Sequence, residues 1–136
     1  MYDWWGAEEG YSFDAVKCYM AHSMGEERLP QTYGLFLDGK IIGMYQFTQE
    51  DLFVRPDIYP WLANVYIDKP YRKMGYGGSL LQSVKNNAAK SLSGNEVFLF
   101  TKHIGLYEKY GWQFVSEIDT FLGESSIERL YRLDLR

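Results

Sequence analysis

The chain has 136 residues, and we predict that residues 1–136 form a single domain, because this length is typical of one. Its net charge of −4 argues against nucleic acid as a partner, because proteins that bind nucleic acid normally carry a basic surface. The single cysteine, Cys18, excludes an intrachain disulfide and a cysteine-based zinc site, and we expect it to be a small buried residue. No apolar run approaches the roughly 18 residues of a membrane span, so we expect a cytoplasmic protein with neither a membrane partner nor a bound metal.

The first predicted helix begins at Ser12, whose hydroxyl suits an N-cap, with Asp14 in the first turn. Apolar residues recur at helical spacing at Phe13, Val16, Tyr19, Met20 and Met24. We expect Gly25 to end this helix and His22 to lie on its surface. Residues 1–10 are expected to form an irregular lead-in.

A hairpin follows the first helix. Two alternating apolar segments, 32–37 and 41–48, flank Asp38-Gly39, a pair that favours a tight turn between antiparallel strands. Residues 49–60 contain two prolines and several acidic residues, so we predict a loop there.

The mostly apolar segment 61–67 predicts a central strand. A glycine-rich loop and a helix over 79–92 come next, followed by the short apolar strand 97–100. We expect strands 61–67 and 97–100 to be parallel, because a helix crosses between them. The last predicted elements are a short helix over 106–110 and strands over 112–118 and 130–135. This order predicts a mixed α/β sheet with one parallel crossover.

The loop between strand 61–67 and the following helix has the features of an anion site. Glycines that precede a helix N-terminus leave free backbone N–H groups there, which bind phosphates well. The Walker pattern is absent because no lysine follows Gly77 and Gly78, and the dinucleotide pattern fails because Leu80 stands where its third glycine belongs. The pattern that is present is Arg72-x-x-Gly75-x-Gly77.

This pattern resembles the acetyl-CoA-binding loop of the GNAT acetyltransferase superfamily. A second segment, Leu-Tyr-Glu-Lys-Tyr-Gly-Trp over 106–112, is similar to the second hallmark of that family. The resemblance covers residues 12–135 and implies a mostly antiparallel sheet with a parallel βαβ centre flanked by helices. The family usually has a strand before its first helix, and in this sequence that strand is either missing or replaced by another segment.

The resemblance implies that acetyl-CoA is the cofactor and that the loop backbone holds its pyrophosphate. Arg72 could contact a phosphate or could fix the loop in place. The strand before the loop would bind the pantetheine arm through its main chain. The implied cofactor-binding residues are Val65, Ile67, Arg72, Lys73, Met74, Gly75, Tyr76, Gly77, Gly78 and Ser79.

The implied reaction is direct acetyl transfer to a primary amine of a small molecule or a peptide. Tyr107 matches the family position of a general acid that protonates the leaving thiolate. Glu50 and Asp51 are expected to bind the acceptor, in a pocket formed by the first helix and the loops 25–31 and 49–60. The sequence does not identify the general base, and a water relay is an equal alternative to the candidates Glu50, Asp51, Asp57, Asn64, Tyr66 and His103.

The sequence leaves two further possibilities. The same fold could serve as a non-catalytic acyl-CoA-binding module that senses its ligand. The chain could also form a homodimer through exposed sheet edges.

Overall fold

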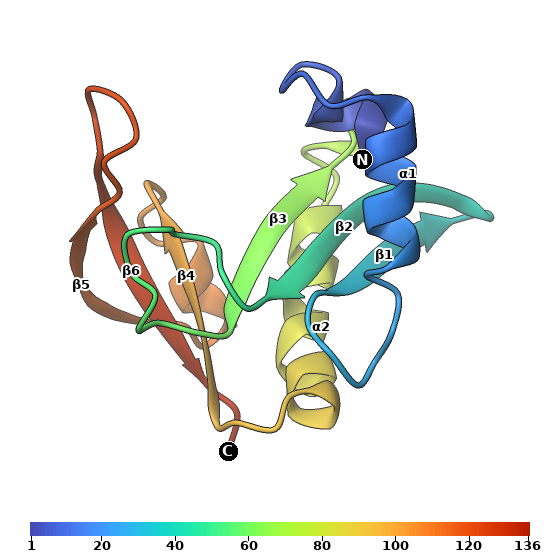
Figure 1. Cartoon of the computed structure of the whole chain (residues 1–136). Helices are drawn as coiled ribbons and strands as arrows, with labels where there is room; N and C mark the ends of the chain where they lie inside the picture. The colour runs from blue at the N-terminus through green and yellow to red at the C-terminus, as the bar shows by residue number, and fades with distance from the viewer.

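Strand β3 (Trp61–Ile67) lies at the centre of a six-stranded sheet, and the computed structural model describes all residues 1–136 (Figure 1). The strand order is β1-β2-β3-β4-β6-β5. The other strands are β1 (Gln31–Leu37), β2 (Lys40–Thr48), β4 (Glu96–Thr101), β5 (Gln113–Asp119) and β6 (Ile127–Asp134). Strands β3 and β4 are parallel and every other neighbouring pair is antiparallel, which confirms the predicted mixed sheet with a parallel centre.

The hairpin of β1 and β2 forms at the predicted turn. Asp38 and Gly39 both have positive φ angles, 50° and 79°, as a type I′ turn requires. Five residue pairs are in regular register, from Gln31 opposite Phe47 to Leu35 opposite Gly43, and one irregularity follows Leu35. The Asp-Gly signal therefore placed the turn correctly.

Helix α2 (Tyr76–Ser91) crosses from β3 to β4 behind the sheet in Figure 1. It begins at Tyr76 rather than at the predicted Ser79, so the second and third glycines of the loop belong to its first turn. Its buried side chains are Leu80, Leu81, Val84 and Ala88. They pack against Tyr45, Phe47 and Leu62 of the sheet in the larger of two apolar clusters. The smaller cluster lies under the 49–60 loop and comprises Leu52, Ile58, Trp61, Ile118 and Leu130.

Strand β3 carries a β-bulge that the sequence pattern did not indicate. Ala63 pairs with Gln46 and Tyr66 pairs with Met44, so Asn64 and Val65 together oppose a single residue of β2. Asn64 adopts a φ of 53°, a left-handed conformation that is uncommon for a residue other than glycine. A bulge of this kind generally bends its strand and increases the local twist.

Strands β3 and β4 touch only at their lower ends in Figure 1 and diverge above. Their ladder consists of the pair Trp61 and Phe98, and the Phe98 N–H donates to the carbonyl of Pro60 at 3.0 Å. The sheet therefore opens between β3 and β4 beyond this pair, and α2 runs behind the neighbouring strands β2 and β3.

Helix α1 (Phe13–Ala21) starts as predicted, with the Ser12 hydroxyl accepting a hydrogen bond from the Ala15 N–H at 3.1 Å. It ends before His22 instead of reaching Gly25, and it buries no residue fully. The prediction that Cys18 is buried is wrong, because its side chain is exposed. Cys18 follows the half-buried Val16 by two positions, which places it on the opposite side of the helix.

The first residues form a turn of π-helix, η1 (Tyr2–Gly6), and not the irregular lead-in that was predicted. No strand precedes α1, as expected. Instead η1 packs on β3, with the Trp4 ring stacked on Tyr66 at 4.9 Å and the Trp5 ring at 5.3 Å from the same ring. The start of the chain thus covers the end of the central strand without joining the sheet.

None of the helices combines the length and the apolar character that a membrane span requires.

Close packing between β2 and β3 predicts a cost for adding one methyl group at Gly43. A Cβ atom there would meet Ile67 Cδ1 at 2.7 Å and the Tyr66 carbonyl oxygen at 3.0 Å. We expect Gly43→Ala to lower the free energy of unfolding by about 1–3 kcal/mol, as overpacking commonly does. Urea denaturation would measure this, with Gly94→Ala as control, since Gly94 has open space around it. Equal stability of the two variants would contradict the predicted strain.

Candidate active site

The gap between β3 and β4 exposes main-chain groups of β3. The Asp68 N–H donates to the Ile42 carbonyl of β2 at 2.7 Å, and Tyr66 lies opposite Met44 of the same strand. Because main-chain groups alternate in direction along a strand, those of Val65 and Ile67 point away from β2 and toward the gap. The structure therefore places both predicted pantetheine-binding residues at the edge of the gap.

Arg72 folds back onto β3 instead of extending into solvent. Its Nε donates a hydrogen bond to the Ile67 carbonyl at 2.8 Å, and its guanidinium lies 4.9 Å from the Tyr66 ring centroid. Of the two roles that the sequence left open for Arg72, the geometry matches the one in which it fixes the loop.

The loop after β3 presents a row of free donors. Gly75 caps α2 with a φ of 86°, and Lys73 has a φ of 64°. No backbone N–H group from 73 to 78 donates a hydrogen bond within the chain, and the Ser79 N–H is the first to do so, to the Gly75 carbonyl at 3.2 Å. Free N–H groups at the start of a long helix, together with its dipole, form a site for an anion.

Glycine suits each of the three positions of the loop for a different physical reason. Gly75 needs its positive φ. At Gly78 a Cβ atom would come within 2.6 Å of the Tyr110 hydroxyl, so the missing side chain lets η3 (Tyr107–Tyr110) pack against the first turn of α2. At Gly77 the nearest atom, Ile67 Cγ1, is 4.0 Å away, which leaves room beside the free N–H groups.

Tyr107 lies in the core beside the same helix. It is 8% exposed, and its ring packs edge-on against Trp112 at 6.1 Å in the cluster that contains Leu80 and Leu81. Its hydroxyl makes no hydrogen bond within the protein, and burial raises its pKa above the usual value of a tyrosine. Tyr107 therefore keeps its proton at neutral pH.

The acidic residues of the 49–60 loop differ in their surroundings. Glu50 is exposed. Asp51 is accessible to solvent but has protein on most sides, and this desolvation together with the Glu128 carboxylate raises the pKa of Asp51 to about 6. Asp57 makes a two-pronged ion pair with Arg55, at 2.8 and 2.9 Å, and the arginine lowers the pKa of Asp57. Asp57 is thus held in its charged form and is a poor base.

Two other candidate bases are engaged or lie elsewhere. The Tyr66 ring is covered by Trp4, Trp5 and Arg72. His103 is exposed in the turn that follows β4, where its backbone N–H donates to the Thr101 hydroxyl at 3.1 Å. The Tyr66 ring is therefore packed between neighbours, whereas the His103 side chain is exposed to solvent.

A buried polar network lies on the face of the sheet opposite α2. Gln46, fully buried on β2, accepts hydrogen bonds at its Oε1 from Asn64 Nδ2 at 2.7 Å and from the Tyr19 hydroxyl at 3.3 Å. Its Nε2 donates to the Thr32 hydroxyl at 2.8 Å. The sequence carried one hint of this network, a glutamine between the aromatic residues of an apolar strand.

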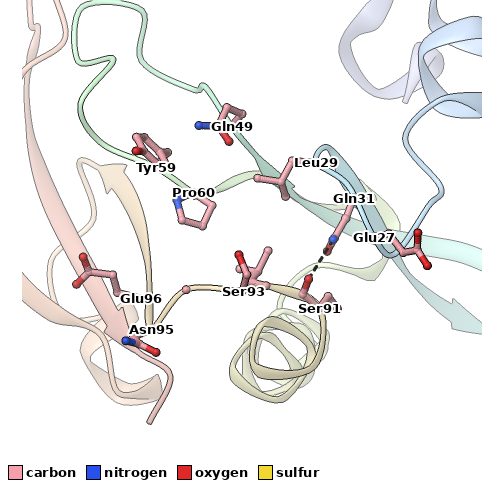
Figure 2. A pocket seen from close by; sticks show the side chains of 12 residues that line it. Glu27, Leu29, Gln31, Gln49, Tyr59, Pro60, Ser91, Ser93, Asn95 and Glu96 are labelled. Carbon is pink, nitrogen blue, oxygen red and sulfur yellow. Dashed lines mark hydrogen bonds between the residues drawn. The ribbon is translucent and has the colours of Figure 1, made fainter.

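Cavities of ligand size lie at several places on the molecule. One of about 630 Å³ lies along residues 25–29, and two others lie at opposite ends of the molecule. Figure 2 shows one of about 540 Å³ beside the C-terminal end of α2, where Gln31 Nε2 donates to the Ser91 carbonyl at 3.4 Å. A helix of 16 residues spans about 24 Å, so this cavity lies far from the glycine loop. Two of the segments expected around the acceptor, the 25–31 and 49–60 loops, line this cavity with Glu27, Leu29, Gln49, Tyr59 and Pro60.

The second cavity, of about 350 Å³, lies beside the bulge of β3. It is lined by the N-terminal segment, α1 and Asn64, and it is partly open to solvent. Of the three segments expected around the acceptor, the first helix alone lines it.

Comparisons with known proteins agree with this architecture. Residues 1–112 match the family model described as Acetyltransferase (GNAT) family. A curated relative, the probable spermine N(1)-acetyltransferase of Bacillus subtilis subsp. natto (strain BEST195), is 31% identical over 98 residues, which cover 67% of this chain. This chain spans 64% of the length of that relative.

Solved structures share the fold at low sequence identity. A GNAT family acetyltransferase from Elizabethkingia anophelis with acetyl-CoA bound is 20% identical, with a TM-score of 0.61 over 90% of this chain and 83% of that one. A spermidine N-acetyltransferase chimera from Vibrio cholerae and hSSAT is 12% identical, with a TM-score of 0.72 over 91% of this chain and 77% of that one. By its family-model match, its curated relative and its fold, this chain belongs to the GNAT acetyltransferase family.

Proposed function

We propose that this protein is an N-acetyltransferase that transfers an acetyl group from acetyl-CoA to a primary amine. The observation that carries the proposal is the row of free N–H groups from 73 to 78 at the mouth of the gap between β3 and β4. The spermine N(1)-acetyltransferase relative supports amine acetylation, and the neighbour crystallised with acetyl-CoA supports the donor.

The donor is held by backbone. The N–H groups of Lys73, Met74, Gly75, Tyr76, Gly77 and Gly78 bind the pyrophosphate, and the Ser79 hydroxyl lies at the edge of the same turn. The main chain of Val65 and Ile67 pairs with the amides of the pantetheine arm, in place of a neighbouring strand. Bound in this way, the donor supplies an acetyl thioester to the gap.

Tyr107 is the proposed general acid for the departing thiolate. Burial keeps the phenol protonated, and burial also disfavours a charged thiolate nearby, so the sulfur becomes a stronger proton acceptor than it is in water. The phenol hydroxyl is free to donate because nothing in the protein accepts from it.

Asp51 is the proposed proton acceptor for the incoming ammonium, with Glu50 beside it at the entrance. Its raised pKa brings it closer to neutrality than an ordinary carboxylate. Burial raises the pKa of the Tyr19 phenol, and the negative charge of Asp51 adds to this rise, which supports a position of Asp51 near the α1 side of the site.

Release of free thiol from acetyl-CoA tests the reaction across a panel of spermine, spermidine, 2-phenylethylamine and a short peptide with a free N-terminus. We expect turnover on at least one amine. In Tyr107→Phe we expect kcat to fall about 100-fold, the lower end for loss of a general acid, with the acetyl-CoA Kd unchanged.

The exposed Tyr59 provides the control Tyr59→Phe, which should keep full activity. Intact turnover in Tyr107→Phe with altered acetyl-CoA affinity would reject the acid role. Tight acetyl-CoA binding without turnover on any amine would instead favour the non-catalytic binding module.

Substitution of a glycine in the loop should weaken acetyl-CoA binding, whereas an equally strained substitution elsewhere should lower stability alone. Gly75→Ala places a side chain at a φ of 86°, which should cost about 1–2 kcal/mol of stability and should distort the N–H cradle. Gly123→Ala imposes similar strain at a φ of 78° in the β5–β6 turn. By calorimetry we expect the acetyl-CoA Kd to rise about tenfold or more in Gly75→Ala and to stay unchanged in Gly123→Ala. An equal Kd in both variants would contradict the cradle.

Asp51 predicts a specific pH dependence. Its carboxyl titrates at about 6 in the folded protein and at about 3.9 when unfolded, so the folded state binds more protons between these values. Stability should therefore fall as pH rises from about 4 to 6, while kcat/KM should rise through about 6 as the base deprotonates.

Asp51→Asn should abolish both effects, whereas Asp57→Asn should leave both in place, because Asp57 is already ionised beside Arg55. Thermal unfolding and kcat/KM measured from pH 4.5 to 8 check this. A limb near pH 6 that survives in Asp51→Asn would remove Asp51 from the mechanism.

A further inference from the structure

The cavity of about 350 Å³ beside Asn64 has the size of a small-molecule pocket, which typically spans about 300–1,000 Å³. Its lining comes from three parts of the chain. The lining residues are Met1, Trp5, Gly6, Glu9, Tyr11, Ala15, Val16, Tyr19 and Asn64. Aromatic and aliphatic side chains dominate, and Glu9 is the one carboxylate among them.

The position of this cavity connects it to the reaction site. Asn64 belongs both to its lining and to the bulge of β3, and the next residue, Val65, turns its main chain to the gap where the acetyl group is presented. Figure 1 shows α1 and the N-terminal segment in front of the sheet and α2 behind it. A molecule in the cavity therefore approaches the gap from the face opposite the donor's helix.

The floor of the cavity is fixed in advance by Gln46. Tyr19 and Asn64, which line the cavity, both donate to Gln46 Oε1, while Gln46 Nε2 is held by Thr32. Every polar atom of this fully buried side chain has a partner. A preorganised floor lowers the entropy that a ligand must lose on binding.

The outer wall is part of the fold as well. Trp5 lines the cavity and lies 5.3 Å from the Tyr66 ring, and Trp4 stacks on the same ring at 4.9 Å. These aromatic contacts hold the N-terminal segment against β3, so the residues of that segment form a stable wall of the cavity.

We propose that this cavity is the acceptor pocket and that it takes a primary amine on an apolar, ring-sized body, such as an arylalkylamine. The inference rests on the proposed acetyl transfer and names its substrate class. Aromatic and aliphatic walls stabilise an apolar body by burial, and their rings favour a cation close by. A polyamine carries several charges along its length, and a lining with one carboxylate leaves most of them without a partner in an apolar cavity.

Two substitutions on α1 distinguish an effect on the pocket from a general effect on the helix. Ala15 lines the cavity, whereas Ala21 lies at the end of the same helix outside it, and both are exposed, so tryptophan at either position can be accommodated in the fold. Ala15→Trp fills the pocket, and Ala21→Trp is the matched control.

The experiment measures kcat/KM for 2-phenylethylamine and for spermine with acetyl-CoA, and in parallel the calorimetric Kd of 2-phenylethylamine and of acetyl-CoA. We expect kcat/KM of the unmodified protein to be about tenfold or more higher for 2-phenylethylamine than for spermine. Ala15→Trp should raise the 2-phenylethylamine Kd about tenfold or more and leave the acetyl-CoA Kd unchanged. Ala21→Trp should change neither Kd.

The outcomes distinguish this inference from the proposed reaction. A preference for spermine, or equal amine affinity in Ala15→Trp and Ala21→Trp, overturns the pocket assignment even when acetyl transfer is observed. Binding of 2-phenylethylamine that Ala15→Trp abolishes, with no thiol released from acetyl-CoA, supports the pocket and rejects the transferase.

Discussion

The short contact between β3 and β4 is the constraint on which the rest of the structure depends. Trp61 opposite Phe98, with one hydrogen bond from Phe98 to Pro60, joins two strands that separate immediately afterwards. A central strand that loses its neighbour leaves main-chain donors and acceptors for another partner, because such groups are almost always paired when they are buried. Helices on both faces of the sheet confine this opening to one gap. The rest of β3, the loop after it and the start of α2 all meet there.

Two polar side chains stabilise the two sides of this gap. On the side of the glycine loop, Arg72 ties the loop to Ile67 and rests on Tyr66. On the side of the cavity beside Asn64, Gln46 ties the bulge to α1 through Asn64 and Tyr19. The glycine-loop side is built from one contiguous stretch, whereas the cavity side joins β2, β3, α1 and the start of the chain.

This difference explains what the sequence could predict. The Asp38-Gly39 turn, the Ser12 cap and the loop around Gly75 are local patterns, and each formed where its residue types predicted. The bulge at Asn64 arises from the register between β2 and β3, and the Gln46 network needs residues that are far apart in the chain. The predicted burial of Cys18 was wrong for a similar reason. Apolar spacing shows which residues share a helix face, but it does not show how closely a sheet covers that face.

The aromatic cluster at the start of the chain has a spectroscopic consequence. The indole rings of Trp4 and Trp5 lie against the Tyr66 phenol, Trp5 also borders the cavity beside Asn64, and Tyr66 contacts Arg72 of the glycine loop. The emission of an indole depends on the polarity and packing around it. The protein thus contains a native fluorophore in contact with both halves of its site, and the binding of each ligand can be followed in solution without an attached label.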